Sequence, residues 1–326
     1  MSKEAKFSTV LSSFGNPADR FCKSGYKSDK TLEEMFIDAR KVEDLTGLEL
    51  VGTWDVNEES VGVIKKFKNE YGFEIVNIMV DLFTKFWQKG SFSSTDPNIR
   101  ARAIEEVKKC MDIASELDCN MVGIWPGQDG YDYIFQQDYM KAWEFLVEGI
   151  KECAEYRKDI KIGIEYKQKE PRTHCFVGTI GKTMTLQNAV NKNNVGLIID
   201  VGHALAADEN AAESIAFCKQ FNGRLFHLHL NDNYRHWDDD MMIGSVHILE
   251  YLELIYWLKR IDYDGWYALD IFPYREDGIG AASESIKWLK AIIRLVDTLE
   301  NSGVKKIIEQ GDAVKTSSFL REFVLK

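Results

Sequence analysis

Four apolar stretches of the sequence contain, at or near their ends, a side chain that could bind a metal ion. These side chains are Glu165, Asp200, His229 and Asp270. Three carboxylates and one imidazole suit Mn²⁺, Mg²⁺ or Co²⁺ better than a structural zinc ion, which is usually held by cysteine and histidine. The first expectation is therefore a divalent-metal site, with Mn²⁺ as the most favoured ion.

A second group of potential ligands follows in the chain. The sequence after Asp200 reads DVGH, which places His203 three residues further on, and a run of three aspartates occupies 238–240. In an extended loop, Asp238 and Asp240 would point the same way. His203, Asp238 and Asp240 therefore predict a second cation site. Two nearby cations can hold two adjacent oxygens of one substrate and polarise its carbonyl group.

Each of these residues also has a plainer interpretation. A carboxylate at a strand end is usually capped or solvated, and consecutive aspartates in a loop often form a solvated face or a helix cap. His227 is expected to be a hydrogen-bonded residue deeper in its strand than His229, and Asp239 to face solvent or a neighbouring subunit. The metal site is favoured because independent solvated residues need not fall at the same end of successive strands.

The segments that must position these residues alternate along the whole chain between short apolar runs and amphipathic stretches. The expected strands are 6–12, 48–55, 73–81, 119–125, 160–167, 195–201, 223–230 and 266–272. The expected helices are 30–46, 58–70, 97–117, 137–156, 181–193, 208–221, 246–260 and 281–300. Eight strands that are each followed by a helix favour a (β/α)8 barrel of the α/β class, and no GxGxxG motif follows the first strand.

One barrel accounts for residues 1–302 as a single domain. Residues 303–326 carry a further helical pattern that no ninth strand follows. We expect this segment to be a C-terminal helical extension that covers the barrel or contacts a neighbouring subunit.

In a barrel of this kind, the loops after the carboxyl ends of the strands form the active site. Side chains alternate along a strand, so Glu165 and Lys167 point to the same face, with Gly163 below them. His229 and His227 share a face in the same way. The residues between them are apolar, as expected for positions that meet the helices. The metal ligands should therefore point together into the mouth of the barrel.

The composition limits the classes of partner. A formal net charge of −11 over 326 residues argues against nucleic acid, whose binding needs clustered lysine and arginine. No stretch approaches the roughly 18 apolar residues of a membrane helix, and the N-terminus lacks the pattern of a signal peptide. A cytoplasmic protein without a membrane partner is expected. The six cysteines are scattered, which argues against disulfide bonds and a CxxC metal site.

At these residues the chain resembles the xylose isomerase-like barrel superfamily, and within it L-rhamnose isomerase and related sugar isomerases. The matching pieces are EYK at 165–167, DVGH at 200–203, HLND at 229–232, DDD at 238–240 and Asp270. They cover the second half of the barrel. The segment WPGQDGYDYIFQ at 125–136 faintly resembles a segment of the rhamnose enzymes.

The resemblance implies a metal-dependent enzyme of carbohydrate metabolism, a homo-oligomer that interconverts an aldose and a ketose by a two-metal hydride shift. The implied ligands of the first ion are Glu165, Asp200, His229 and Asp270. Those implied for the second ion and its activated water are His203, Asp238 and Asp240. The implied catalytic residues are Lys167, which contacts a substrate oxygen, Asp238, Asp240 and Glu165.

Other residues are expected to hold the substrate itself. Trp54 and Trp125 fall at strand ends, where an aromatic wall would suit the apolar face of a sugar. Arg235 and His203 complete the expected substrate-binding set. A free monosaccharide is favoured over a sugar phosphate because no Gly-rich phosphate cradle follows the last two strands.

The main alternative is a ketose 3-epimerase, a related branch in which two glutamates exchange the proton at carbon 3. In that branch the last-strand ligand is Glu, and an Arg follows the metal-binding His by six residues. Arg235 has this spacing from His229 and favours the epimerase, whereas Asp270, the aspartate run and Lys167 favour the isomerase. An abasic-site endonuclease, which would need a basic rim, and a non-catalytic sugar-binding barrel are further alternatives.

Overall fold

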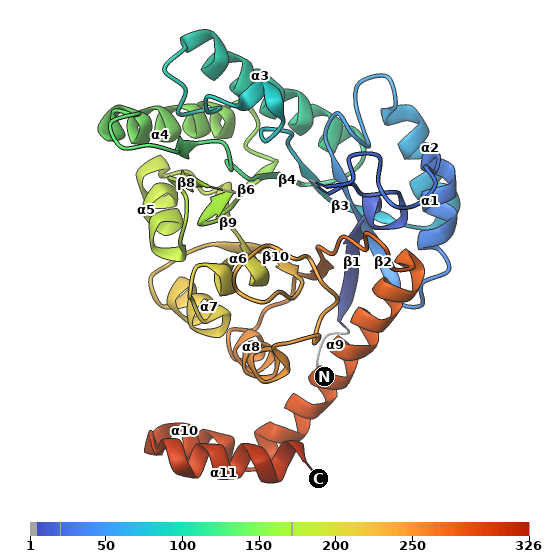
Figure 1. The fold of residues 1–326 in the computed structure, drawn as a ribbon, viewed down its shortest axis with the longest axis vertical. Coiled ribbons are helices and arrows are strands. Elements are labelled where there is room, and N and C mark those ends of the chain that lie inside the picture. The colour runs from blue at the N-terminus through green and yellow to red at the C-terminus, as the bar shows by residue number, and fades with distance from the viewer. Residues whose placement is uncertain (1–4, 20, 171, 326) are drawn as a thin grey trace.

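The computed structural model describes residues 5–19, 21–170 and 172–325. In this part of the chain, eight parallel strands close into a barrel in the order β1-β11-β10-β9-β6-β4-β3-β2, and helices surround it (Figure 1). The strands are β1 Lys6–Val10, β2 Leu45–Val51, β3 Glu74–Met79, β4 Met121–Ile124, β6 Lys161–Glu165, β9 Val195–Asp200, β10 Leu225–Leu230 and β11 Trp266–Leu269. The predicted single barrel of the α/β class is confirmed.

The helices lie close to the predicted ranges. They are α1 Leu32–Ala39, α2 Val61–Tyr71, α3 Pro97–Glu116, α4 Tyr139–Tyr156, α5 Ile180–Val190, α7 Ala211–Gln220, α8 Ile248–Arg260 and α9 Gly278–Asn301, with short 3-10 turns η1 Leu11–Phe14 and η2 Lys85–Trp87. Most begin at a side-chain cap: Asp138 accepts hydrogen bonds from two backbone N–H groups of α4, and Asp277 does the same for α9. The main difference from prediction is α1, which ends at Ala39 because the chain turns there toward β2.

The core lies between the barrel and its helices. Outward strand residues such as Ile162 and Ile164 are fully buried together with Leu146 and Ile150 of α4 in one continuous cluster. This burial orients each strand, so that alternate residues must point into the barrel. The strand ends therefore present their inward side chains to the mouth.

Part of the barrel interior is a small apolar floor under the mouth. Val51, Met79 and Ile198 form this separate buried cluster. The neighbouring strands carry glycine beside it: a Cβ at Gly123 would lie 2.1 Å from the Met79 sulfur, and one at Gly163 would lie 2.6 Å from Ile198 Cγ1. The glycines thus leave room for the floor beneath the predicted ligands.

Two elements beside the mouth were not predicted. Helix α6 (Val201–Ala206) begins directly after β9, because Asp200 caps it by accepting a 2.7 Å hydrogen bond from the backbone N–H of His203. The loops after β4 and β6 also form an antiparallel sheet, which consists of β5 Gly130–Tyr131, β7 Lys169–Glu170 and β8 Thr173–Cys175. Both elements constrain loops that carry predicted site residues.

The C-terminal segment is helical, with α10 (Val304–Gln310) and α11 (Ala313–Val324) beyond the end of α9 (Figure 1). No residue of α11 is fully buried, and its Phe319 and Phe323 rings stack with centroids 6.0 Å apart. The division at 302 and 303, and the role of this segment as a cover or a subunit contact, stay predictions. Among the described helices, none is long and apolar enough to cross a membrane.

The close packing of β9 can be tested with a pair of glycine substitutions. A Cβ at Gly196 would lie 2.4 Å from the backbone oxygen of Arg224 on the way into β10, whereas one at Gly181 in α5 meets nothing within 4 Å. We expect Gly196→Ala to lower the free energy of unfolding by about 1–3 kcal/mol. Gly181→Ala should leave it unchanged or raise it by up to about 1 kcal/mol. Urea denaturation measures both, and equal effects would contradict this packing.

Candidate metal centre

The carboxyl ends of four adjacent strands bring the first predicted ligand set together. Glu165, Asp200, His229 and Asp270 each offer one ligand atom, and these atoms all lie within 4.8 Å of one another. The barrel order β6-β9-β10-β11 makes their strands neighbours, and the register places His229 directly beside Asp200. The first three side chains are at most 3% exposed. The predicted proximity of this set is therefore observed.

One atom of His229 faces the carboxylates of this first group. Its Nδ1 lies 3.2 Å from Glu165 Oε1 and 3.4 Å from Asp270 Oδ2. Burial and the nearby charges of Asp200 and Glu165 raise the pKa of Asp270 to about 8, although His229 opposes this. Burial likewise raises the pKa of Asp200 to about 6, despite nearby His203. Three carboxyl groups thus share one buried space, and a bound cation would stabilise their ionised forms.

A second group shares Asp200 with the first. Ligand atoms of Asp200, His203 and Asp238 lie within 4.8 Å of one another. His203 Nε2 is 3.0 Å from Asp238 Oδ2, while its Nδ1 lies 3.2 Å from Glu165 Oε1. The other oxygen of Asp238, Oδ1, is buried without a hydrogen-bond partner in the described part of the chain. The two groups therefore adjoin each other at the mouth of the barrel.

Asp240 is not a member of the ligand groups found among the described residues, and its role at a second site stays a prediction. The prediction assumed an extended loop, but Asp240 has a left-handed backbone (φ 47°) and its carbonyl accepts a 3.0 Å hydrogen bond from Phe272 N. The Asp240 carboxylate nevertheless lies close to the ligand groups, where burial and the nearby charges of Asp238 and Asp270 raise its pKa well above the ordinary value. Asp239 is partly exposed, and its carboxylate accepts a hydrogen bond from the backbone N–H of Tyr234; its orientation toward solvent or a neighbouring subunit stays a prediction.

Lys167 lies at the second group, on the same side as Glu165. Its ammonium donates a 2.8 Å hydrogen bond to Asp238 Oδ2 and forms an ion pair with Glu170 of β7. Burial would lower the pKa of Lys167, but the charges of Asp238 and Glu170 outweigh it and hold the pKa above its ordinary value. Lys167 is therefore a fixed positive charge beside the ligand groups.

Aromatic rings form one side of the mouth. Phe83 links two of the predicted tryptophans: its ring centroid lies 5.0 Å from that of Trp125 and 5.4 Å from that of Trp54. Trp125 lies 6.4 Å from the His203 ring, and the Lys167 ammonium is 4.8 Å from the Trp125 ring centroid. Trp125 borders the ligand groups directly, whereas Trp54 is 55% exposed at the outer end of the row.

Arg235 is not placed at the ligand groups. Its guanidinium lies 3.3 Å from Glu250 of α8, and it lines a small cavity beside α6 and α7. Its backbone is left-handed (φ 67°), and its N–H donates to the side chain of Asn233. In this conformation Arg235 contacts the outer helices, so its substrate-binding role is not supported by proximity.

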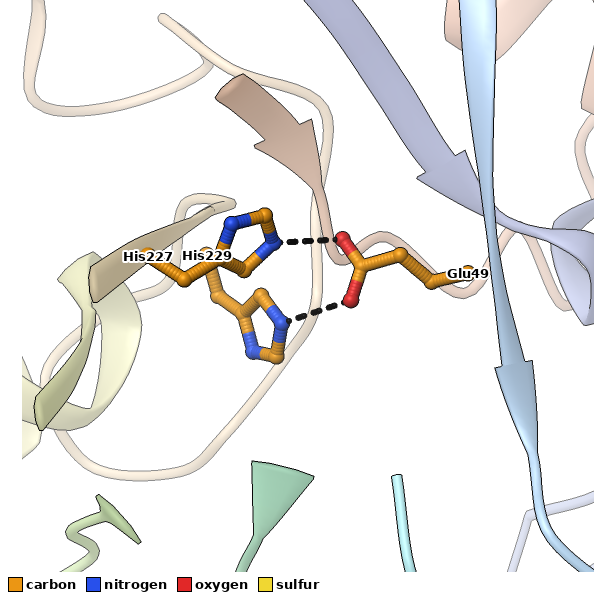
Figure 2. Close-up of side chains that lie close together, drawn as sticks. All are labelled: Glu49, His227 and His229. Atoms are coloured by element: carbon orange, nitrogen blue, oxygen red, sulfur yellow. Dashed lines mark hydrogen bonds and ion pairs between the residues drawn. The ribbon is translucent and has the colours of Figure 1, made fainter. Parts of the chain in front are cut away.

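A third group lies deeper in the barrel, and sequence reasoning missed its central member. Glu49 of β2 is fully buried, and its two oxygens accept hydrogen bonds from His227 Nε2 at 2.9 Å and His229 Nε2 at 3.1 Å (Figure 2). Burial opposes ionisation of Glu49, but the charges of His227 and His229 hold its pKa below the ordinary range. A glutamate between Leu48 and Leu50 in an apolar strand was the available signal.

Sequence and structure comparisons place this fold among known proteins. The chain matches the model of the xylose isomerase-like TIM barrel over residues 39–292. A xylose isomerase from Thermus thermophilus is 26% identical over 237 residues, which represent 69% of this chain and 61% of that enzyme. The chain thus spans less than two thirds of the length of this relative.

Solved structures agree at the level of the fold. A D-tagatose 3-epimerase-like protein has a TM-score of 0.69 at 22% identity, with 90% of this chain and 98% of that chain covered. An L-ribulose 3-epimerase has a TM-score of 0.72 at 13% identity, with 91% and 97% covered. The family match extends from β2 through most of α9 and includes all three groups of side chains. This protein belongs to the xylose isomerase-like TIM barrel family.

Proposed function

We propose that this protein is a divalent-metal-dependent isomerase that interconverts an aldose and a ketose, with a free monosaccharide as substrate. The observation that carries the proposal is the sharing of Asp200 by two adjacent ligand groups at the barrel mouth. Such an arrangement suits a small substrate that offers two neighbouring oxygens. The xylose isomerase relative supports the same reaction class.

The residues present fit divalent cations. Asp238 Oδ1 is buried with no hydrogen-bond partner in the described chain, although a buried carboxylate oxygen is costly to leave unpaired. The first group adds three carboxylates and one imidazole, a set rich in oxygen ligands. We propose that Glu165, Asp200, His229 and Asp270 would hold one ion. Asp200, His203 and Asp238 would hold another, with Mn²⁺ the favoured metal.

The chemistry divides between the ions and the side chains around them. Bound cations would polarise the carbonyl and the adjacent hydroxyl of the sugar, which favours a hydrogen shift between carbons 1 and 2. Lys167 would donate a hydrogen bond to the sugar oxygen at which negative charge develops. A water molecule oriented by Asp238 and Asp240 would carry the hydroxyl proton from one sugar oxygen to the other.

The row of Trp54, Phe83 and Trp125 would bind the apolar face of the sugar and exclude water from the reacting carbons. Trp125 is the most direct contact because it also borders His203 and Lys167.

Three further expectations stay predictions: the narrower resemblance to L-rhamnose isomerase, a homo-oligomeric state and a cytoplasmic location.

A ketose 3-epimerase is the second candidate, and the specific observation in its favour is the close fold likeness to solved 3-epimerases. In that reaction Glu165 would act as a base at carbon 3, and the six-residue spacing between His229 and Arg235 would match the pattern of the epimerase branch. Two contacts favour the isomerase instead: Lys167 is held at the ligand groups by Asp238, and Arg235 is held away from them by Glu250.

The sharing of Asp200 predicts a particular metal stoichiometry. Chelator-treated wild-type protein should bind two Mn²⁺ ions by titration calorimetry. Asp238→Asn should retain one tightly bound ion. Asp200→Asn should weaken the affinity for both ions by more than about 100-fold, because loss of a direct ligand costs more than the roughly 10- to 100-fold typical of a residue that only supports a ligand. Asp239→Asn is the matched control and should still bind two ions, because Asp239 bonds the Tyr234 backbone and is outside the ligand groups found in the described part of the chain. Two tight ions in Asp200→Asn would contradict the shared ligand.

The reaction class can be determined by isotope labelling. Mn²⁺-loaded protein incubated in D₂O with a panel of ketoses and aldoses should produce an aldose–ketose pair with little deuterium at carbons 1 and 2, since a shifted hydrogen does not exchange with solvent. NMR identifies both the products and the position of the label. A ketose epimer labelled at carbon 3 would reject the isomerase in favour of the epimerase.

Lys167 provides a test of the charge placed near the substrate oxygen. Lys167→Met should lower kcat by about 100- to 1000-fold, as is typical when one donor to a developing oxyanion is removed. The number of bound Mn²⁺ ions should stay at two. Lys169→Met changes an exposed lysine on the adjoining strand and should retain wild-type kcat. Equal rates in the two variants would exclude the proposed role of Lys167.

A further inference from the structure

The buried Glu49 group joins the barrel interior to the candidate metal centre. Glu49 comes from β2, while His227 and His229 come from β10 on another side of the barrel, and their side chains point toward one another across the interior (Figure 2). The three residues are at most 1% exposed. His229 belongs also to the first ligand group, so its ring links Glu49 to the candidate centre.

The contacts of the two ring nitrogens show which nitrogen of His229 would keep its hydrogen when a cation binds. Glu49 Oε2 already accepts a 2.8 Å hydrogen bond from Asn77 Nδ2, so it behaves as an acceptor toward His229 Nε2 at 3.1 Å. An ionised carboxylate can only accept, and a neutral imidazole has one N–H and one lone pair. Nε2 therefore carries a hydrogen. Nδ1 faces Glu165 and Asp270, so it is the nitrogen that would give up its own proton and offer a lone pair when a cation binds between these carboxylates.

We propose that Glu49 is a positioning residue that holds His229 in the tautomer and ring orientation required to bind a cation through Nδ1. Ligating histidines commonly donate their second N–H to a carboxylate, which fixes the ring and increases the basicity of the ligating nitrogen. The inference rests on the proposed metal-dependent function and adds a residue of β2 to a centre otherwise built from the second half of the chain.

His227 supports this arrangement from the other side of the carboxylate. It donates to Glu49 Oε1 at 2.9 Å, and its ring lies edge-on to that of His229 at a centroid distance of 5.3 Å. With one oxygen held by His227 and the other by Asn77, the carboxylate cannot rotate without breaking two hydrogen bonds. The plane of the Glu49 carboxylate is therefore fixed relative to the His229 ring.

The same three residues are close enough together to hold an ion themselves. Two observations favour the positioning role. Three N–H donors converge on the Glu49 carboxylate, including the amide of Asn77, which a cation at Oε2 would displace. In addition, an ion bound to His229 Nε2 would leave the proton on Nδ1, where it would block ligation by His229 in the first group.

The test measures metal binding rather than turnover. Titration of chelator-treated protein with Mn²⁺ should give an affinity about 10- to 100-fold weaker for Glu49→Gln than for wild type at the first site. Protein labelled with ¹⁵N-histidine and loaded with ¹¹³Cd²⁺, a diamagnetic probe, should show coupling of the metal to His229 Nδ1 and a proton on Nε2. In Glu49→Gln the Nε2 proton signal should weaken or disappear.

Two further variants make the result specific. Asp129→Asn removes another fully buried carboxylate, one that Ser91 and Ser93 hold outside the three groups, and its Mn²⁺ affinity should stay within about two-fold of wild type. Glu49→Asp keeps the charge but shortens the reach to His229, so it should weaken Mn²⁺ binding even where Glu49→Gln does not fold. Circular dichroism and thermal unfolding verify that each variant is folded.

Wild-type affinity in folded Glu49→Gln and Glu49→Asp, or coupling of cadmium to His229 Nε2, would overturn the proposal. Failure of the proposed reaction gives a different pattern. If wild-type protein converts no sugar but Glu49→Gln still weakens Mn²⁺ binding, the positioning role stands and the reaction is wrong. If sugars are isomerised while both Glu49 variants bind Mn²⁺ as wild type does, the reaction stands and the positioning role is wrong.

Discussion

The structure depends on the burial of several carboxylates at one end of a parallel barrel. Glu165, Asp200 and Asp270 lie within reach of one another where little water can screen them. Burial, together with their mutual repulsion, raises the pKa of Asp200 and of Asp270. A protein rarely retains such repulsion unless cations compensate for it. The same constraint explains why imidazole rings and the Lys167 ammonium surround the cluster, and why hydrogen bonds from backbone and Asn231 hold Asp200 in place.

The barrel meets this constraint by holding the buried carboxylates and histidines on rigid strands and helices. β9 and β10 are in register at Asp200 and His229, and the apolar floor of Val51, Met79 and Ile198 closes the space beneath the first group. Helix α6 uses Asp200 as its cap, so one carboxylate both ends a strand and begins a helix. A side chain with two structural hydrogen bonds has little freedom to move, which favours a preorganised ligand.

The sequence was most informative where a potential metal ligand lies at the end of an apolar run with the alternating pattern of a strand. Glu165, Asp200 and His229 end apolar runs, so alternation and the known layout of barrel loops suffice to bring them together. The sequence was less informative where the position of a side chain depends on an unusual backbone conformation, or on contact with a segment far away in the chain. The left-handed turn at Asp240 follows from contacts with the loop after β11, and the small sheet arises from pairing between two loops. Glu49 lies 178 residues before His227, so no local pattern joins them.

These features also bear on how one fold accommodates different sugar reactions. The barrel and its strand-end ligands are common ground for the isomerase and epimerase interpretations, so the difference must come from side chains that reach the substrate. Asp270 is one methylene shorter than a glutamate, which makes it a weaker candidate for a base that must extend to a substrate carbon. Lys167, in contrast, is fixed between Asp238 and Glu170, and the latter belongs to the small sheet beside the mouth. A positive charge held there by a loop element suits charge on a substrate oxygen better than proton abstraction from carbon, and this is the physical basis for favouring the isomerase.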